Sequence, residues 1–182
     1  MLKITLEAPE EWDPITSTFS YPKPVVLTLE HSLVSVSKWE MKHKKPFINQ
    51  ERTVEEFDDY IRCMTLTQNV NPEVYRRITQ KNREEVQRYI DDSMTAAVIH
   101  DDGTSKRSNE FVTSDLVYYW MVESNIPFDP CQKWHLNRLL TLIRIVGIKR
   151  RTDNKMSKAD SARRHAATNA ARRAKMAKKP HK

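Results

Sequence analysis

The chain has 182 residues, a length that allows one domain or a modest domain with a tail, and its formal net charge is +7. Only two glycines and two cysteines are present, which argues against glycine-rich phosphate loops, dinucleotide-binding fingerprints and disulfide frameworks. No stretch approaches the ~20 apolar residues that cross a bilayer, and the N-terminus lacks the apolar segment of a signal peptide, so we expect a soluble, intracellular protein without a membrane partner.

Alternating apolar residues predict two short, half-buried strands near the N-terminus, at residues 2–6 and 25–29. The intervening N-terminal arm, residues 7–24, contains four prolines and the aromatic residues Trp12, Phe19 and Tyr21. Because proline cannot donate a backbone hydrogen bond to a ladder, we expect an extended segment without regular structure. Its aromatic side chains are candidates for docking, either on the protein's own body or on a neighbouring subunit.

Helical patterns dominate from residue 31 onward. Apolar residues at near-helical spacing predict a helix over residues 31–43, before a Lys-Lys-Pro sequence. Thr53 followed by Glu56 is a capping box that opens a second helix. Asn71-Pro72 places a cap residue before a first-turn proline, and Asn82 followed three residues later by a glutamate predicts a further helix start.

Two stronger helices follow a predicted hairpin. Residues 94–100 and 109–113 flank Asp101-Asp102-Gly103, a sequence typical of a tight turn. One helix is predicted to start near Thr113 or Ser114. The next opens at Asp129-Pro130 and is apolar almost all the way round, with Gly147 as the residue that follows its end. A helix so apolar should be the centre of the core.

The charge is divided unevenly along the chain. Residues 149–182 hold 13 basic and two acidic side chains, a net charge of +11, whereas residues 1–148 hold 18 basic and 22 acidic ones. We therefore expect a mainly α-helical α+β domain over 1–148, with a small N-terminal and central β element. A basic, alanine-rich helical arm over 149–182, the basic arm, follows it. Ser157 and Asp160 imitate a capping box there, and the alanines gather on one side of the helix.

The basic arm is the one feature that points to a binding function. A strongly basic segment beside an acidic body commonly binds a polyanion or an acidic protein surface. A run of charged residues can also be a solvated helix face. Arginine suits phosphate because its planar guanidinium donates two parallel hydrogen bonds. No base-reading motif accompanies the arm, so any nucleic-acid binding should be independent of sequence. The candidate residues are Lys149, Arg150, Arg151, Arg163, Arg164, Arg172, Arg173, Lys175, Lys178 and Lys179.

Other residues offer weaker candidates for chemistry. Cys131 and His135, four apart on the predicted central helix, could face one metal ion, but a zinc site needs three or four ligands, and a buried thiol beside an imidazole is the plainer interpretation. The acidic pairs Asp58-Asp59 and Asp91-Asp92 suit solvated surface, and the serines after His31 lack a nucleophile elbow. The stripe Tyr118-Tyr119-Trp120 suits the core. We therefore predict no catalytic, cofactor or metal site.

Several stretches resemble a family of small proteins from the structural gene modules of tailed bacteriophages. The resemblance covers most of the chain from about residue 25 onward. It carries no catalytic or ligand motif, so no functional residue follows from it. The stretches are His31-Ser-Leu-Val-Ser-Val-Ser-Lys-Trp-Glu40, Tyr60-Ile-Arg-Cys-Met-Thr-Leu66, Tyr118-Tyr-Trp-Met121, Asn125-Ile-Pro-Phe128, Cys131-Gln-Lys-Trp-His-Leu-Asn-Arg-Leu-Leu-Thr-Leu-Ile-Arg144 and Asn169-Ala-Ala-Arg-Arg-Ala-Lys175.

The resemblance implies a non-enzymatic virion structural protein of the tail or head–tail module, found in the particle and, during assembly, in the host cytoplasm. Its partners would be other phage structural subunits in a multi-copy assembly, with DNA as a further partner of the basic arm. Two alternatives stay open: a tail assembly chaperone absent from the mature particle, and a sequence-nonspecific nucleic-acid-binding protein.

Overall fold

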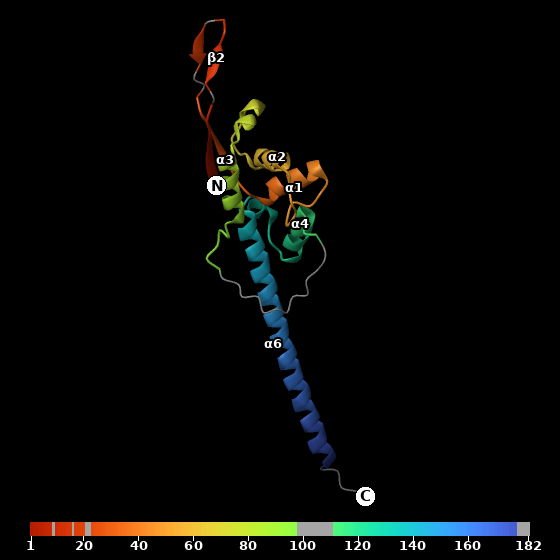
Figure 1. Cartoon of the computed structure of the whole chain (residues 1–182). Helices are drawn as coiled ribbons and strands as arrows, with labels where there is room; N and C mark the ends of the chain where they lie inside the picture. Colours follow the sequence, from red (N-terminus) through yellow and green to blue (C-terminus); the bar gives the residue numbers. More distant parts are fainter. Residues whose placement is uncertain (9, 16, 21–22, 98–110, 178–182) are drawn as a thin grey trace. The chain divides into compact units, whose positions relative to one another are not determined.

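The structure, a computed structural model, describes residues 1–8, 10–15, 17–20, 23–97 and 111–177. The chain divides into two compact units, Met1–Ile143 and Arg144–Lys182. The elements are mostly helices with two small antiparallel sheets, which confirms the predicted mainly α, α+β class (Figure 1). The predicted turn at Asp101-Asp102-Gly103 lies outside the described residues, and the prediction of strands beside it is wrong for residues 94–97 and 111–113, which form no strand.

The first sheet joins the two predicted strands. β1 (Leu2–Leu6) pairs antiparallel with β4 (Val25–Leu29), and Ile4 stands opposite Leu27. Alternate side chains point into the core, so that Ile4, Leu6, Leu27 and Leu29 are at most 1% exposed. The period-two pattern in the sequence therefore predicted both the strands and the face that they bury.

The N-terminal arm is more regular than its prolines suggested. β2 (Glu11–Asp13) and β3 (Thr18–Ser20) form a second antiparallel pair, in which Trp12 stands opposite Phe19. The two rings lie with centroids 4.9 Å apart, and aromatic cross-strand pairs of this kind stabilise a ladder. We call residues 11–20 the aromatic hairpin; the prediction of an irregular segment is wrong for these residues.

In the part of the chain that the structure describes, seven helical segments follow the strands. The capping box of Thr53 and Glu56 is formed as predicted, with each side chain bound to the other's backbone N–H. The start predicted at Asn82 is wrong by one turn, because Thr79 is the cap and Asn82 is its partner in a second capping box. The segments are α1 (Leu33–His43), α2 (Val54–Met64), the 3-10 helix η1 (Pro72–Arg77), α3 (Gln80–Asp91), α4 (Ser114–Glu123), α5 (Phe128–Cys131) and α6 (Leu136–Ala177).

The predicted central helix differs most from the structure. Asp129 has extended backbone angles (φ −97°, ψ 129°), so Asp129-Pro130 does not open a long helix. The backbone N–H of Leu136 instead donates to the His31 carbonyl at 2.7 Å, and α6 starts there. Gly147 does not end it, and Ser157 starts no new helix, because both lie inside α6. Leu139, Leu140 and Leu142 before it and Lys149, Arg150 and Arg151 after it are strong helix formers, which offset the cost of about 1 kcal/mol that an interior glycine imposes.

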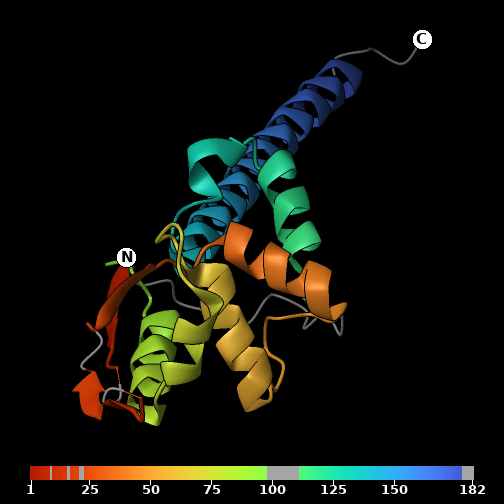
Figure 2. The same ribbon diagram turned by 90° about the horizontal axis from the view of Figure 1, so that it is seen from above.

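One core holds the first unit together. α1 packs against both α2 and α4, and α3 packs against β1 and α2 (Figure 2). Trp39 of α1 and Tyr60 of α2 are fully buried large side chains at its centre, and Phe47 lies against both rings. The stripe of α4 is only partly in the core, because Tyr119 is 59% exposed; the interpretation of all three aromatics as core is wrong for this residue.

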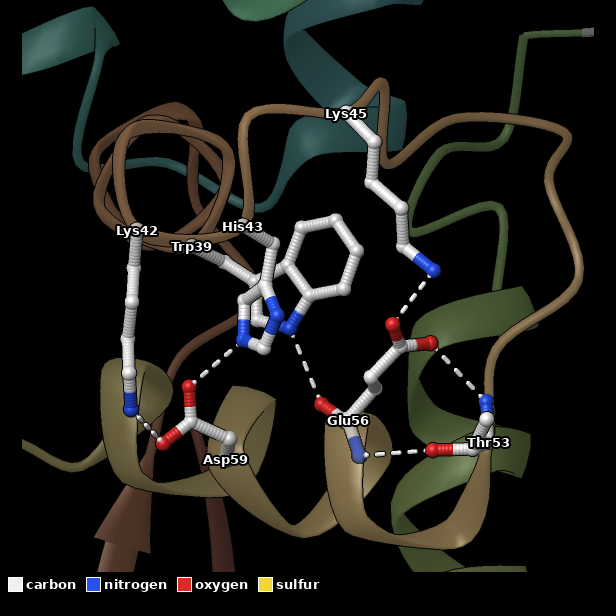
Figure 3. Close-up of polar contacts among 7 residues, drawn as sticks. All are labelled: Trp39, Lys42, His43, Lys45, Thr53, Glu56 and Asp59. Atoms are coloured by element: carbon white, nitrogen blue, oxygen red, sulfur yellow. Dashed lines mark hydrogen bonds and ion pairs between the residues drawn. The ribbon is translucent and has the colours of Figure 1, made fainter.

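Polar contacts align α1 with α2 across this core (Figure 3). The indole N–H of Trp39 donates to the Glu56 carbonyl at 2.9 Å, and the imidazole of His43 stacks on the indole ring. Asp59 accepts from Lys42 and from His43, the latter at 2.8 Å. The two helices are thus fixed by apolar contact and by specific hydrogen bonds.

Candidate functional site

The second unit contains a run of exposed cations five residues after its start at Arg144. Lys149, Arg150 and Arg151 are consecutive residues of α6, and all three are exposed. Consecutive residues on a helix point about 100° apart, so this run spreads positive charge over about 200° of the helix circumference. Arg163, a further predicted residue, is exposed as well.

The other predicted cations fall in less fully described parts of the arm. Arg164, Arg172, Arg173 and Lys175 lie within the bounds of α6, and Lys178 and Lys179 lie outside the described residues. Ala162 and Ala170, two members of the predicted alanine face, are exposed. α6 therefore presents small side chains and cations to its surroundings, a combination that lets a partner's backbone or phosphates approach closely.

The aromatic hairpin is a second exposed feature. Trp12 is 52% exposed and Phe19 is 54% exposed, although the two rings cover part of each other. Exposed large aromatics are enriched at protein interfaces, where they contribute much of the binding energy. Tyr21, the third predicted docking residue, lies outside the described residues.

A buried polar cluster joins the segments that precede α1 and α6. The Nδ1 atom of His31 lies 2.5 Å from the Tyr60 hydroxyl, and the His31 and His135 rings meet edge to face with centroids 5.0 Å apart. His135 Nε2 lies 2.9 Å from the backbone carbonyl of Tyr89. The cluster was missed in the sequence because its members lie far apart along the chain, and no local motif marks them.

The environment keeps these imidazoles neutral. Burial lowers the pKa of His31 to about 3, with further contributions from the nearby His135 and Arg52. Burial also lowers the pKa of His135, although its hydrogen bond to the Tyr89 carbonyl opposes the shift. Burial raises the pKa of the Tyr60 hydroxyl, which stays protonated. A neutral, mutually bonded set of this kind suits a structural role and supplies no charged acid near neutral pH.

A cavity of about 490 Å³ opens beside His31. Three of its polar lining side chains are bonded to the protein itself. Arg52 donates to the Phe47 carbonyl at 2.7 Å, and Gln87 donates to Asp91 at 2.9 Å. Asn137 likewise donates to the Ile90 carbonyl at 2.8 Å. These groups do not converge on the cavity as ligand-binding groups would.

The acidic pair of α2 has a more specific role than solvated surface. Asp58 accepts two hydrogen bonds from Arg83 of α3, each 2.7 Å long, whereas Asp59 is bonded to α1. Hydrogen bonds from Lys42 and His43 lower the pKa of Asp59, although burial, the largest single influence, acts to raise it. Because neighbouring helical residues point about 100° apart, one pair ties α2 to two different helices.

The remaining candidates for chemistry do not form a site. Cys131 lies in α5 and His135 precedes α6, so they are not on one helix as predicted. Ser32 and Ser35 form the capping box of α1. Among the residues that the structure describes, no group of three or more His, Cys, Asp or Glu side chains is placed to hold a metal ion, and no helix has the length and hydropathy to cross a bilayer.

Comparisons with protein-family models, with curated proteins and with solved structures found no match to this chain.

Proposed function

We propose that this protein is a non-enzymatic structural component of a tailed-phage particle, in the tail or head–tail module. It acts through protein–protein contacts, and its basic arm binds an acidic subunit surface or packaged DNA. The observation that carries the proposal is the exposed cation run of Lys149, Arg150 and Arg151 on α6, together with the arm's net charge of +11. The assignment to a phage particle rests on the sequence resemblance described above.

The energetics of the arm support a binding function. An isolated helix in water gains little from propensity alone, and alanine side chains bury little apolar area. A helix with this composition is stabilised when its cations meet an anionic surface that also covers the alanines. Neutralisation of several anions also releases their counterions, which makes such binding strong at low salt and weak at high salt.

Mass spectrometry of purified particles tests the proposal. A structural component is expected at a fixed copy number relative to the other particle proteins, in every preparation. Absence from particles, with abundant protein in the infected cell, would contradict the proposal and support the tail assembly chaperone. A variant that combines Lys149→Gln, Arg151→Gln and Arg163→Gln, which we call the neutralised arm, should be incorporated into particles at a lower copy number.

The composition of the basic arm also supports a second candidate function, that of a sequence-nonspecific nucleic-acid-binding protein. Its arginines occur in the adjacent pairs Arg150-Arg151, Arg163-Arg164 and Arg172-Arg173, and arginine binds phosphate through paired hydrogen bonds. A gel shift on duplex DNA of unrelated sequences should then show equal affinity for each. The neutralised arm should bind every one of these DNA sequences more weakly, and by the same factor.

A control variant separates the arm from general charge. Lys3→Gln, Lys38→Gln and Lys81→Gln combined removes three exposed cations from the first unit. It lowers the net charge by the same amount as the neutralised arm does. Equal loss of DNA binding in the two variants would contradict a specific role for the arm.

A further inference from the structure

We propose that the acidic surface bound by the basic arm is the aromatic hairpin of a second copy of this chain. This inference rests on the proposed function, because it names the partner of the arm. It makes the contact heterologous: one copy supplies the hairpin and the next copy supplies α6. Since every copy carries both surfaces, the contact repeats from subunit to subunit, and such contacts build rings or filaments.

The hairpin supplies an apolar anchor within an acidic segment. Trp12 and Phe19 are each about half exposed, and their rings pack on each other as a preformed pair. Residues 7–20 contain four acidic residues and no Lys or Arg, a net charge of −4, and Glu7 and Glu10 are exposed. The segment therefore combines a rigid aromatic patch, which favours burial, with charges that favour a cationic partner.

The arm supplies the complementary surface. Lys149, Arg151 and Arg163 are exposed cations of α6, and Ala162 and Ala170 are exposed small residues. Small side chains let an aromatic ring approach the helix backbone closely, and an arginine can stack on a tryptophan face. The arm carries a net charge of +11, whereas residues 1–148 together carry a net charge of −4.

The charge balance favours a second copy over an unrelated acidic subunit. The hairpin and the arm carry opposite charges within one sequence, so copies at high local concentration attract each other through these two segments. Such complementarity raises the association rate and selects the partner.

A charge exchange in the full-length protein tests the pairing. The acidic-segment variant combines Glu7→Lys and Glu10→Lys, which lie just before the aromatic hairpin, with Glu11→Lys in its first strand. The arm variant combines Lys149→Glu, Arg151→Glu and Arg163→Glu. Sedimentation velocity at about 50 mM salt, where charges are weakly screened, should show self-association of the wild type. Each variant alone should associate more than about tenfold less tightly, because like charges then meet. An equimolar mixture of the two variants should recover association.

A neutral variant separates the aromatic contribution. Trp12→Ser with Phe19→Ser keeps every charge and should also weaken self-association, whereas Tyr119→Ser, at an exposed aromatic residue of α4, should not. Circular dichroism checks that each variant keeps its helices.

Three results would overturn the inference: a monomeric wild type at all concentrations, variants that associate as the wild type does, or a mixture that fails to recover. The proposed function would survive each of them if particles still contained the chain and the neutralised arm lowered its incorporation. The arm's acidic partner would then be a different subunit.

Discussion

At the scale of single residues, the strongest constraint lies where β4 leads into α1. His31 is 2% exposed and shares a short contact with the Tyr60 hydroxyl. Desolvation disfavours a charged imidazole, so protonation of the buried His31 destabilises the fold. The residue thereby couples the stability of the first unit to pH.

This coupling predicts that the protein loses stability in mild acid. The pKa of His31 is about 3 in the folded protein and about 6.5 in the unfolded chain, so the unfolded chain takes up the proton first. The stabilisation is complete above pH ~6.5 and is lost as the pH falls towards 3, with a slope of at most about 1.4 kcal/mol per pH unit. Urea unfolding at a series of pH values between ~7 and ~4.5 measures this loss of unfolding free energy.

His31→Asn is the matched variant, because an amide can bond to Tyr60 and does not titrate. We expect lower stability at neutral pH and a shallower loss in acid than in the wild type. Parallel curves for the two proteins over the same pH range would show that His31 does not carry the effect.

Asp59 gives a second prediction at this scale. Its pKa is lowered in the folded protein, so its stabilising contribution is present above the unfolded pKa of about 3.9 and is lost as the pH falls through the folded value. Asp59→Asn should destabilise the protein by about 1 kcal/mol at pH 7, and the difference from the wild type should narrow in strong acid. The exposed Glu51→Gln provides the control in the same denaturant titrations. A difference independent of pH would contradict this account.

At the scale of elements, local signals in the sequence predicted most of the helix starts. Thr53 with Glu56 and Asn71 with Pro72 act as expected, since caps bind backbone groups within the same turn. The paired strands were also predictable, because alternation over five residues specifies which face is buried. The start of α3 is the exception, because Thr79 and Asn82 form a local capping box in which Thr79, and not the predicted Asn82, is the cap.

The failures at this scale have tertiary causes. Asp129-Pro130 has the composition of a helix start, but α6 begins only at Leu136, whose N–H bonds to His31 more than 100 positions earlier. The aromatic hairpin was missed because its stabilising pair, Trp12 and Phe19, outweighs the surrounding prolines. The buried set of His31, Tyr60 and His135 was hidden for the same reason: contacts between distant segments leave no local pattern.

The capping box of α2 gives a prediction at the scale of elements. Thr53→Ala removes the oxygen that accepts from the Glu56 N–H and should cost about 1 kcal/mol of stability. Thr53→Ser keeps that oxygen and should stay within about 0.5 kcal/mol of the wild type. Thermal or urea unfolding followed by circular dichroism compares them. Equal destabilisation by both substitutions would show that the hydroxyl group does not act as a cap.

At the scale of the whole molecule, two units of opposite character lie in one chain. The first has a dense core, bonded helices and an exposed aromatic hairpin, and the second is a helical unit with a strong positive charge. The sequence predicted a boundary at residue 149, because charge and aromatic content change together there, whereas the compact units divide between Ile143 and Arg144. The candidate arm residues came from composition alone, whereas the continuity of α6 from Leu136 to Ala177 required the structure.

The account's central claim is that the basic arm binds a polyanion, and the salt dependence of that binding tests it most directly. Fluorescence anisotropy would follow full-length protein binding to labelled duplex DNA and to labelled polyglutamate over a series of salt concentrations. We predict that the logarithm of the binding constant for DNA falls linearly with the logarithm of the salt concentration. The neutralised arm should lower that slope by about 2.7, or about 0.9 for each cation removed, whereas the control variant at Lys3, Lys38 and Lys81 should leave it unchanged. Weak binding of both polyanions at low salt, or equal slopes for the wild type and the neutralised arm, would contradict the claim.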